Sequence, residues 1–149
     1  MSRKVSLLVF TCVAVALALG IQGVAQTAPQ TVKGLEISVS AITRGENVSL
    51  GDCPPGENSV RGVIRPGDTR EFATVTIDVK VLPSFDSAAI VRPPGLTDAD
   101  GNAYRTAQAF TDAGSPATYS CDFSFRVPKG MGLSTVTIEG ATFDVSELE

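Results

Sequence analysis

Residues 72–82 have the sequence FATVTIDVKVL, which is the clearest structural pattern in the chain. Valine or isoleucine occupies every second position, and threonine, aspartate or lysine occupies the positions between them. The apolar set is Val75, Ile77, Val79 and Val81, and the polar set is Thr74, Thr76, Asp78 and Lys80. Alternation in β-branched residues is typical of a strand with one buried and one solvated face. We therefore predict a strand from Phe72 to Leu82 that ends at Pro83.

The same alternation recurs on both sides of this segment. The alternation is strong from Leu35 to Ala41, where Leu35, Ile37, Val39 and Ala41 are expected to face inward. It is also strong from Tyr119 to Val127, where Phe123 and Phe125 are core candidates. Shorter strands are predicted at Val60–Ile64, Ala88–Val91, Thr135–Glu139 and Ala141–Val145. Past the N-terminal 25 residues, no window shows the spacing of an amphipathic helix.

Seven or eight short strands with turn residues between them predict an all-β fold. We expect an immunoglobulin-like antiparallel β-sandwich that covers residues 32–149 as one domain. Tyr119, two residues before Cys121, resembles the tyrosine that precedes a cysteine in strand F of immunoglobulin domains. The longest irregular stretches are Arg44–Ser59 and Pro83–Gly95, which are predicted as loops.

From about Arg65 onward, the order of features resembles a family of bacterial exported domains of unknown function. The resembling features are a Pro66-Gly67-Asp68 turn, the strand after it, an L-x-D-x-D-G-x-x-Y segment from Leu96 to Tyr104, and F-x-V-P-K-G from Phe125 to Gly130. That family has an immunoglobulin-like sandwich and includes secreted immunoprotective extracellular antigens. The resemblance implies a fold and an export route, and it implies no catalytic residues.

The N-terminus has the pattern of a secretory signal peptide. Arg3 and Lys4 precede an uncharged run from Val5 to Ile21, and Gly23-Val24-Ala25 supplies small residues for cleavage. We predict a signal peptide over residues 1–25, a flexible leader over 26–31, and a secreted or periplasmic protein without a membrane span after cleavage. The alternative is that the leader is kept as a membrane anchor, although its apolar run is short for a spanning helix.

Export would leave two cysteines in an oxidising compartment, Cys53 and Cys121. We predict a structural disulfide between them, which would close a long loop of the chain. The alternatives are two free thiols or an intermolecular pair. A reactive pair has less support because the CxxC spacing is absent and the chain has no histidine to activate a thiolate.

Composition excludes several classes of function. The chain has 149 residues, 12 basic and 16 acidic side chains, and no histidine. The lack of histidine excludes Ser-His-Asp and Cys-His relays. The acidic balance argues against binding to nucleic acid, which needs a basic face. We therefore expect a protein that is not an enzyme and that uses no cofactor.

Asp98, Asp100 and Asn102 place oxygen atoms at alternate positions, as the start of a calcium-binding EF-hand loop does. The pattern then fails, because Ala103 stands where glycine is needed and Ala109 stands where a bidentate glutamate is needed. A weak calcium site remains an alternative. Because Asp-Gly is a strong turn signal, we predict a turn here and no metal.

The function favoured by these features is that of a monomeric, exported domain that binds a protein or a cell-envelope component. Sandwich domains commonly bind through their loops, so Arg44–Ser59 and Pro83–Gly95 are the candidate binding segments. The first alternative is an envelope subunit that self-assembles by pairing of edge strands. The second, more remote alternative is a hydrolase that uses carboxylates alone.

Overall fold

The computed structural model describes residues 25–56 and 62–149, and all regular elements in these ranges are β-strands. The strands are β1 (Gln30–Val32), β2 (Leu35–Gly45), β3 (Val48–Leu50), β4 (Gly62–Ile64), β5 (Arg70–Val81), β6 (Gly95–Asp98), β7 (Ala103–Arg105), β8 (Thr118–Pro128), β9 (Leu133–Ile138) and β10 (Ala141–Asp144). The described ranges contain no helix that is long and apolar enough to span a bilayer. Residues 1–24 of the predicted signal peptide and Val60 of one predicted strand lie outside these ranges.

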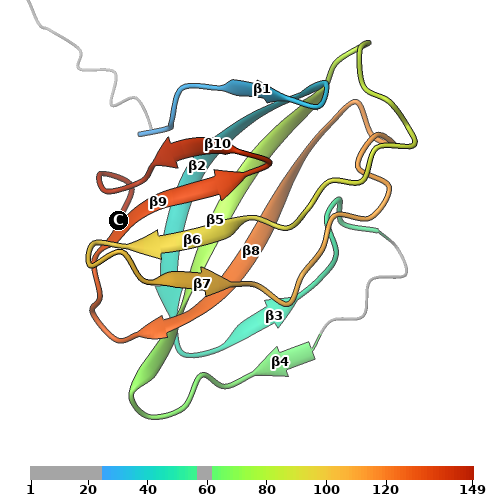
Figure 1. Ribbon diagram of the computed structural model, residues 1–149. Helices are drawn as coiled ribbons and strands as arrows, with labels where there is room; N and C mark the ends of the chain where they lie inside the picture. The colour runs from blue at the N-terminus through green and yellow to red at the C-terminus, as the bar shows by residue number, and fades with distance from the viewer. Residues whose placement is uncertain (1–24, 57–61) are drawn as a thin grey trace, which may run out of the picture.

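Two four-stranded antiparallel sheets form the sandwich, which confirms the predicted fold class (Figure 1). The first sheet has the order β1-β2-β5-β8, the second has the order β10-β9-β6-β7, and β3 and β4 form a separate pair. Without β1, β3 and β4, seven strands remain. Their first, second and fifth members lie in one sheet, and their third, fourth, sixth and seventh lie in the other. In immunoglobulin domains too, the first, second and fifth strands lie in one sheet and the third, sixth and seventh strands lie in the other, so this sandwich is immunoglobulin-like.

The core lies between the two sheets and is made by alternate residues of the long strands. The fully buried side chains include Val75 and Ile77 of β5, Phe123 and Phe125 of β8, and Phe143 of β10. Antiparallel pairing places Val75 opposite Phe123 and Ile77 opposite Cys121, so these residues share the inner face. The predicted strands at 72–82 and 119–127 are confirmed, with β5 and β8 as their counterparts.

Two hairpins of the sandwich have tight turns with the same backbone conformation. Lys33-Gly34 joins β1 to β2, and Glu139-Gly140 joins β9 to β10. All four residues have positive φ (49°, 79°, 48° and 90°), as a type I′ hairpin turn requires. This backbone twist matches that of the flanking strands, and the final hairpin falls where the sequence predicts strands at 135–139 and 141–145.

The alternation expected in β2 fails after Val39. Its register with β5 shifts between Val39 and Ala41, so Ile42 is buried in the core where Ala41 was predicted to face inward. A bulge of this kind moves the following side chains to the opposite face. The strand then continues to Gly45, and β3 follows at Val48–Leu50, so the prediction of a continuous loop from Arg44 to Ser59 is wrong in this part.

Two other predicted segments differ in the structure. Residues 88–91 form no strand, because Asp86 organises a turn in which its carbonyl accepts the Ala89 N–H at 2.8 Å and its carboxylate accepts the Ala88 N–H. The segment 26–31, predicted as a flexible leader, lies along β2. The Thr27 N–H donates to the Val39 carbonyl at 2.9 Å, and residues 30–32 pair with β2 as β1.

The predicted disulfide is confirmed, because Cys53 and Cys121 are bonded and their Cα atoms are 5.5 Å apart. It ties the segment after β3 to β8, which is the fifth of the seven sandwich strands. The resemblance of Tyr119 to the strand F tyrosine is therefore wrong in its strand position. Its hydroxyl nevertheless donates to an upstream backbone carbonyl, that of Ala113, at 2.8 Å.

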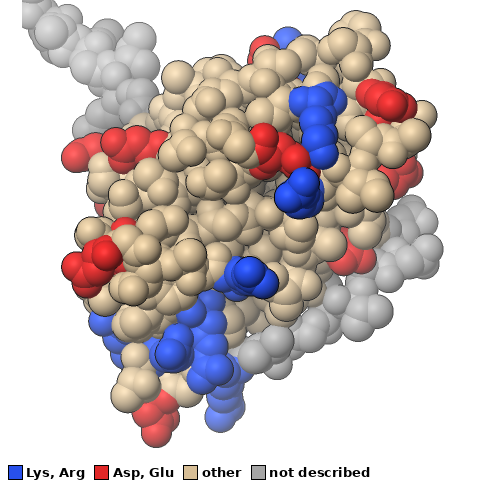
Figure 2. Space-filling model, in the orientation of Figure 1, with Lys and Arg blue, Asp and Glu red and all other residues tan. Residues whose placement is uncertain are grey.

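Charged side chains are distributed unevenly on the face shown in Figure 2. Lys and Arg atoms gather at the lower left, where Figure 1 shows the end of β8 and the start of β5. Asp and Glu atoms are more scattered, mostly near the outline of the molecule, with one group beside Lys and Arg atoms in the upper central part of the face. A chain with an acidic balance thus carries a local basic region.

Candidate functional site

The Pro83–Gly95 loop connects the end of β5 to the start of β6 and lies at the upper right of Figure 1. Its Ile90 is 81% exposed and is the only exposed large hydrophobic residue among those whose side chains the structure describes. A lone exposed aliphatic side chain is common on protein surfaces. What distinguishes Ile90 is the way its backbone is held.

Bonds from two other segments fix the backbone that follows the Ile90 side chain. The Lys33 ammonium, in the β1–β2 turn, donates to the Ile90 carbonyl at 2.7 Å. The Arg92 N–H donates to Oε1 of Glu139, in the β9–β10 turn, also at 2.7 Å. Val91, between these two bonds, is buried in the core. The Ile90 side chain therefore projects into solvent from a backbone that has little freedom to move.

The start of the loop is fixed by close packing. The Leu82 N–H donates to the Gly34 carbonyl at 2.9 Å, and the Phe85 ring packs over Gly114. A Cβ at Gly34 would lie 2.5 Å from Phe85 Cα, and a Cβ at Gly114 would lie 2.4 Å from Phe85 Cε1. Since real Cβ atoms do not approach so closely, position 34 requires glycine for the loop backbone to adopt this path, and a Cβ at position 114 would displace the Phe85 ring.

Glu139 is the electrostatic centre of this arrangement. Its side chain is largely buried, and Oε2 lies 3.0 Å from the Lys33 ammonium. The Arg92 backbone N–H, followed by the Lys33 ammonium, lowers the pKa of Glu139 below its ordinary value. The carboxylate is therefore charged at neutral pH, and its contacts with the Arg92 N–H and the Lys33 ammonium persist there.

The other predicted binding segment, Arg44–Ser59, is divided between different environments. Its first residues complete β2, and Val48–Leu50 form β3. Cys53 is buried and disulfide-bonded, and its N–H and C=O pair with the Ala109 carbonyl and the Thr111 N–H. Residues 57–59 lie outside the described part of the chain. Of the two candidate segments, Pro83–Gly95 is therefore the one that is described throughout its length and held in place as a loop.

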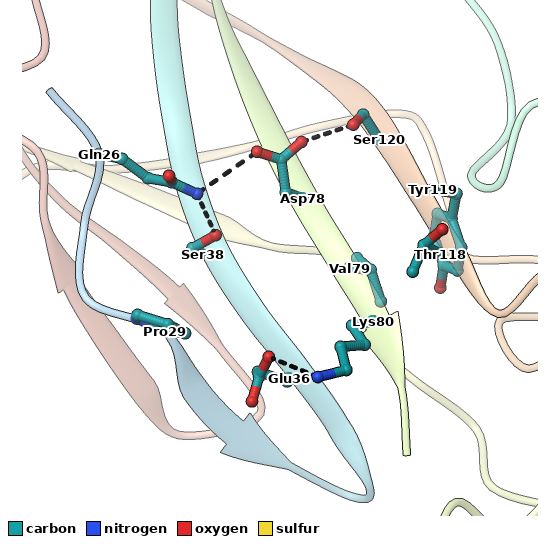
Figure 3. A pocket seen from close by; sticks show the side chains of 10 residues that line it. All are labelled: Gln26, Pro29, Glu36, Ser38, Asp78, Val79, Lys80, Thr118, Tyr119 and Ser120. Carbon is teal, nitrogen blue, oxygen red and sulfur yellow. Dashed lines mark hydrogen bonds and ion pairs between the residues drawn. The ribbon is translucent and has the colours of Figure 1, made fainter. Parts of the chain in front are cut away.

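A polar hollow of about 410 Å³ lies on the outer face of the first sheet (Figure 3). The Gln26 amide donates to Ser38 Oγ at 2.7 Å and to Asp78 Oδ2 at 3.5 Å, and Ser120 Oγ donates to the other Asp78 oxygen. The Lys80 ammonium lies 3.6 Å from Glu36 Oε1. Both carboxylates in the hollow are therefore engaged by side chains of the protein itself.

The Asp98 segment is a turn built around one carboxylate. Asp98 is 1% exposed, and its Oδ1 accepts the N–H groups of Asp100 and Asn102 at 3.0 and 2.8 Å. Its Oδ2 accepts the Asn102 amide at 3.0 Å and the Tyr104 hydroxyl at 2.7 Å. Both oxygens of Asp98, the first ligand of the calcium alternative, are thus engaged by donors of the protein itself. Among the described residues, no three Asp, Glu or Cys side chains form a group able to hold a metal ion.

Gln108 has a structural role that the sequence does not reveal. Its buried amide donates to the Gly51 carbonyl at 2.7 Å and to the Asp122 carbonyl at 2.6 Å, and its Oε1 accepts the Ser124 N–H at 2.7 Å. One side chain thereby pairs with β8 as a neighbouring strand would. Gln108 lies in an irregular segment without periodicity, so no sequence signal marks it.

No protein-family model matches the chain, so the resemblance to the family of exported domains stays a prediction. No curated protein matches it either. Among solved structures, the chain is similar to an uncharacterized β-sandwich protein from Clostridium difficile 630. The two are 13% identical with a TM-score of 0.46, and the match covers 80% of this chain and 89% of the other. The functional conclusion therefore depends on the geometry of the site.

Proposed function

We propose that the chain is an exported, non-enzymatic domain that binds a protein partner through its Pro83–Gly95 loop. The observation that carries this proposal is the 81% exposed Ile90 on a backbone held by Lys33 and Glu139. A preorganised loop loses little conformational entropy on binding, and apolar anchors in central pockets supply much of the affinity of interfaces. The expected partner has a pocket that accepts one aliphatic side chain.

Export is supported by the signal-peptide pattern and by the family resemblance. The hydrolase alternative has less support because Asp98 and Asp78 are hydrogen-bonded to protein donors and Glu36 faces Lys80. The self-assembly alternative has less support because Gln108 covers part of the β8 edge. At the other edge of the first sheet, the Gln30 amide donates to the Thr142 carbonyl of β10 at 2.7 Å.

The test starts with a photo-crosslinking residue at position 90 in cells that naturally produce the chain. Position 137, an exposed threonine of β9, serves as the matched control. We expect one adduct that forms from position 90 and not from position 137. The crosslinked protein is then purified and titrated with the unmodified domain, which gives a Kd for each variant.

The titration compares two substitutions of Ile90 with one of Lys33, whose ammonium holds the Ile90 carbonyl. Ile90→Ala should weaken binding by roughly tenfold or more, because burial of an isoleucine side chain contributes about 1.5–3 kcal/mol. Lys33→Met should also weaken binding, since it frees the Ile90 carbonyl although Lys33 need not touch the partner. Full binding by Ile90→Asp, or equal crosslinking from position 137, would show that the loop is not the binding segment.

A further inference from the structure

Four basic side chains gather at the end of the sandwich opposite the Ile90 loop. Arg70 begins β5, Arg65 lies in the turn before it, Arg126 lies near the end of β8, and Lys129 follows that strand. The 12 residues of β5 separate this basic end from the Pro83–Gly95 loop by roughly 36 Å. The lower left of Figure 2 shows Lys and Arg atoms gathered in this region.

Strand pairing brings these cations close together. Arg70 pairs with Pro128 and Phe72 pairs with Arg126, so Arg70 and Arg126 are diagonal neighbours on one face, about 7–8 Å apart at their Cα atoms. A Cβ at Gly67 would lie 3.1 Å from Arg126 Nη2, which places that guanidinium against the turn that carries Arg65. Arg70 and Arg126 are thus neighbours, and Arg65 is two residues away from the glycine that lies beside Arg126.

Glu71 and Glu149 at this end are engaged by a fifth cation, Arg44, and most of the charge on the other four side chains has no ion-pair partner. All four side chains are exposed, and Arg65, Arg70 and Arg126 have no ion pair with any described carboxylate. Lys129 lies 2.9 Å from Glu46, and that pair is exposed to solvent. Uncompensated guanidinium groups are good ligands for phosphate because their planar fork donates two parallel hydrogen bonds.

The shape of this end favours the phosphate groups of a polymer over those of a lipid bilayer. A hollow of about 420 Å³ is lined by Arg65 and Lys129, with Gly67 at its wall and Glu46 and Asp68 as its acidic members. A polymer can enter such a hollow, whereas a flat bilayer cannot. Side chains that insert into membranes are apolar or aromatic. Among the described side chains, the one exposed large hydrophobic residue, Ile90, is at the opposite end.

We propose that this basic end binds a phosphodiester polymer without bases, such as poly(glycerol phosphate), with Arg65, Arg70, Arg126 and Lys129 as its phosphate contacts. None of these contacts is an aromatic side chain that could stack on a nucleic-acid base. The domain then has two binding ends, one for phosphate groups and one for an apolar pocket. The Glu46–Lys129 ion pair competes with the polymer for Lys129. Loss of the Glu46 charge should therefore strengthen binding.

The test titrates the whole chain with a fluorescently labelled poly(glycerol phosphate) at several salt concentrations. For three or four phosphate contacts, log K against log salt concentration should fall with a slope of about −2 to −3. Arg65→Gln and Arg126→Gln should each weaken binding about fivefold and reduce the slope by about 0.7. Glu46→Gln should strengthen binding.

Lys80→Gln is the matched control, because it removes the same charge from an exposed position near the far end of β5. Lys80→Gln should change the affinity for the polymer less than twofold. Ile90→Asp should also change it less than twofold, so a failure of polymer binding is distinguishable from a failure of the proposed protein binding. Arg126→Lys should keep the salt slope while weakening binding slightly. Absence of binding, or equal effects of Arg126→Gln and Lys80→Gln, would overturn the proposal. So would equal affinity for polyglutamate, or a preference for phosphatidylglycerol vesicles over the polymer.

Discussion

Asp98 and Tyr104 show how a single pair of side chains makes a turn sensitive to acid. The Tyr104 hydroxyl, followed by the Asn102 amide and two backbone N–H groups, lowers the pKa of Asp98 from 3.8 to about 2. All of these donors stabilise the charged carboxylate in the folded chain. Since the folded pKa lies below the unfolded one, the stabilisation is complete above pH 4 and is lost as the pH falls towards 2.

We predict that Tyr104→Phe makes the free energy of unfolding less dependent on pH between 4 and 2. The variant lacks the strongest donor to Asp98, so the pKa of that carboxyl should return towards its ordinary value. Tyr104→Phe should also be less stable than the unmodified chain at neutral pH. Urea unfolding at a series of pH values measures both effects.

Tyr119→Phe is the control for this comparison. Its hydroxyl donates to the neutral Ala113 carbonyl, and burial raises the pKa of Tyr119 to about 12, far above the range tested. It should lose about 1 kcal/mol of unfolding free energy equally at every pH. Parallel pH profiles for the two phenylalanine variants would contradict the role given to Tyr104.

Gln108 gives the second prediction at the residue scale. Gln108→Leu keeps the size of the side chain but leaves three backbone groups, on Gly51, Asp122 and Ser124, without a partner. Because a buried unpaired group costs about 1–3 kcal/mol, we expect the free energy of unfolding to fall by about 3 kcal/mol. The Ser124 amide should also exchange its hydrogen much faster.

Gln30→Leu is the matched control, since it removes one solvent-exposed bond to Thr142. Its cost should be about 0.5–1 kcal/mol, and Ser124 exchange should not change. Slow exchange at Ser124 in Gln108→Leu would show that the Gln108 amide does not protect the strand edge.

At the scale of elements, alternation predicted the long strands that build most of the core, but it missed β6 and β7, which have only four and three residues, although Leu96 of β6 is fully buried. β5 and β8 follow the pattern closely, because each has one face against the opposite sheet and one polar face. The other failures arise where another interaction overrides the pattern. A bulge in β2 turns Ile42 inward, and a carboxylate-organised turn replaces the strand predicted at 88–91.

The Pro83–Gly95 loop was predicted as an irregular segment, but the features that make it a candidate site were not. Ile90 belonged to a predicted strand, and its exposure depends on contacts from Lys33 and Glu139, which are distant in sequence. The sequence could have revealed the Lys33-Gly34 and Glu139-Gly140 turns, because glycine at the second position favours the type I′ conformation. It could not show that both turns lie beside the loop.

The disulfide is the element-scale prediction. It joins the segment after β3 to β8 across 68 positions, and in the chain-entropy model a loop of this length contributes about 4 kcal/mol. Cys53→Ala with Cys121→Ala should therefore lower the free energy of unfolding by about 4 kcal/mol. The bonds from Cys53 to Ala109 and Thr111 should keep the fold intact.

Urea unfolding of the oxidised chain, the reduced chain and the double variant measures this contribution. Reduction should add two hydrogens to the mass and bring the midpoint close to that of the double variant. Equal stability of the oxidised chain and the double variant would contradict a stabilising role for the bond.

At the scale of the whole molecule, the open edges of the sheets decide whether copies of the chain can pair. Edge strands are templates for pairing unless they are short or covered. β8 is a long edge strand of 11 residues, and its cover comes from the Gln108 amide and from the segment held by the Cys53 disulfide. β1, at the other edge of the first sheet, has only three residues.

We therefore predict that the unmodified chain is a monomer and that removal of the β8 cover makes it self-associate. The variant combines Gln108→Leu with Cys53→Ala and Cys121→Ala, which frees the backbone groups of β8 to pair with a second copy. Sedimentation velocity over a range of concentrations should show a dimer for this variant alone. Gln30→Leu with the same cysteine changes is the control, because it is also destabilised but keeps Gln108 on β8. A triple variant that stays monomeric while its Ser124 amide exchanges rapidly would show that exposure of the β8 edge is not enough to cause pairing. That result would also argue against the alternative in which copies of the chain assemble through this edge.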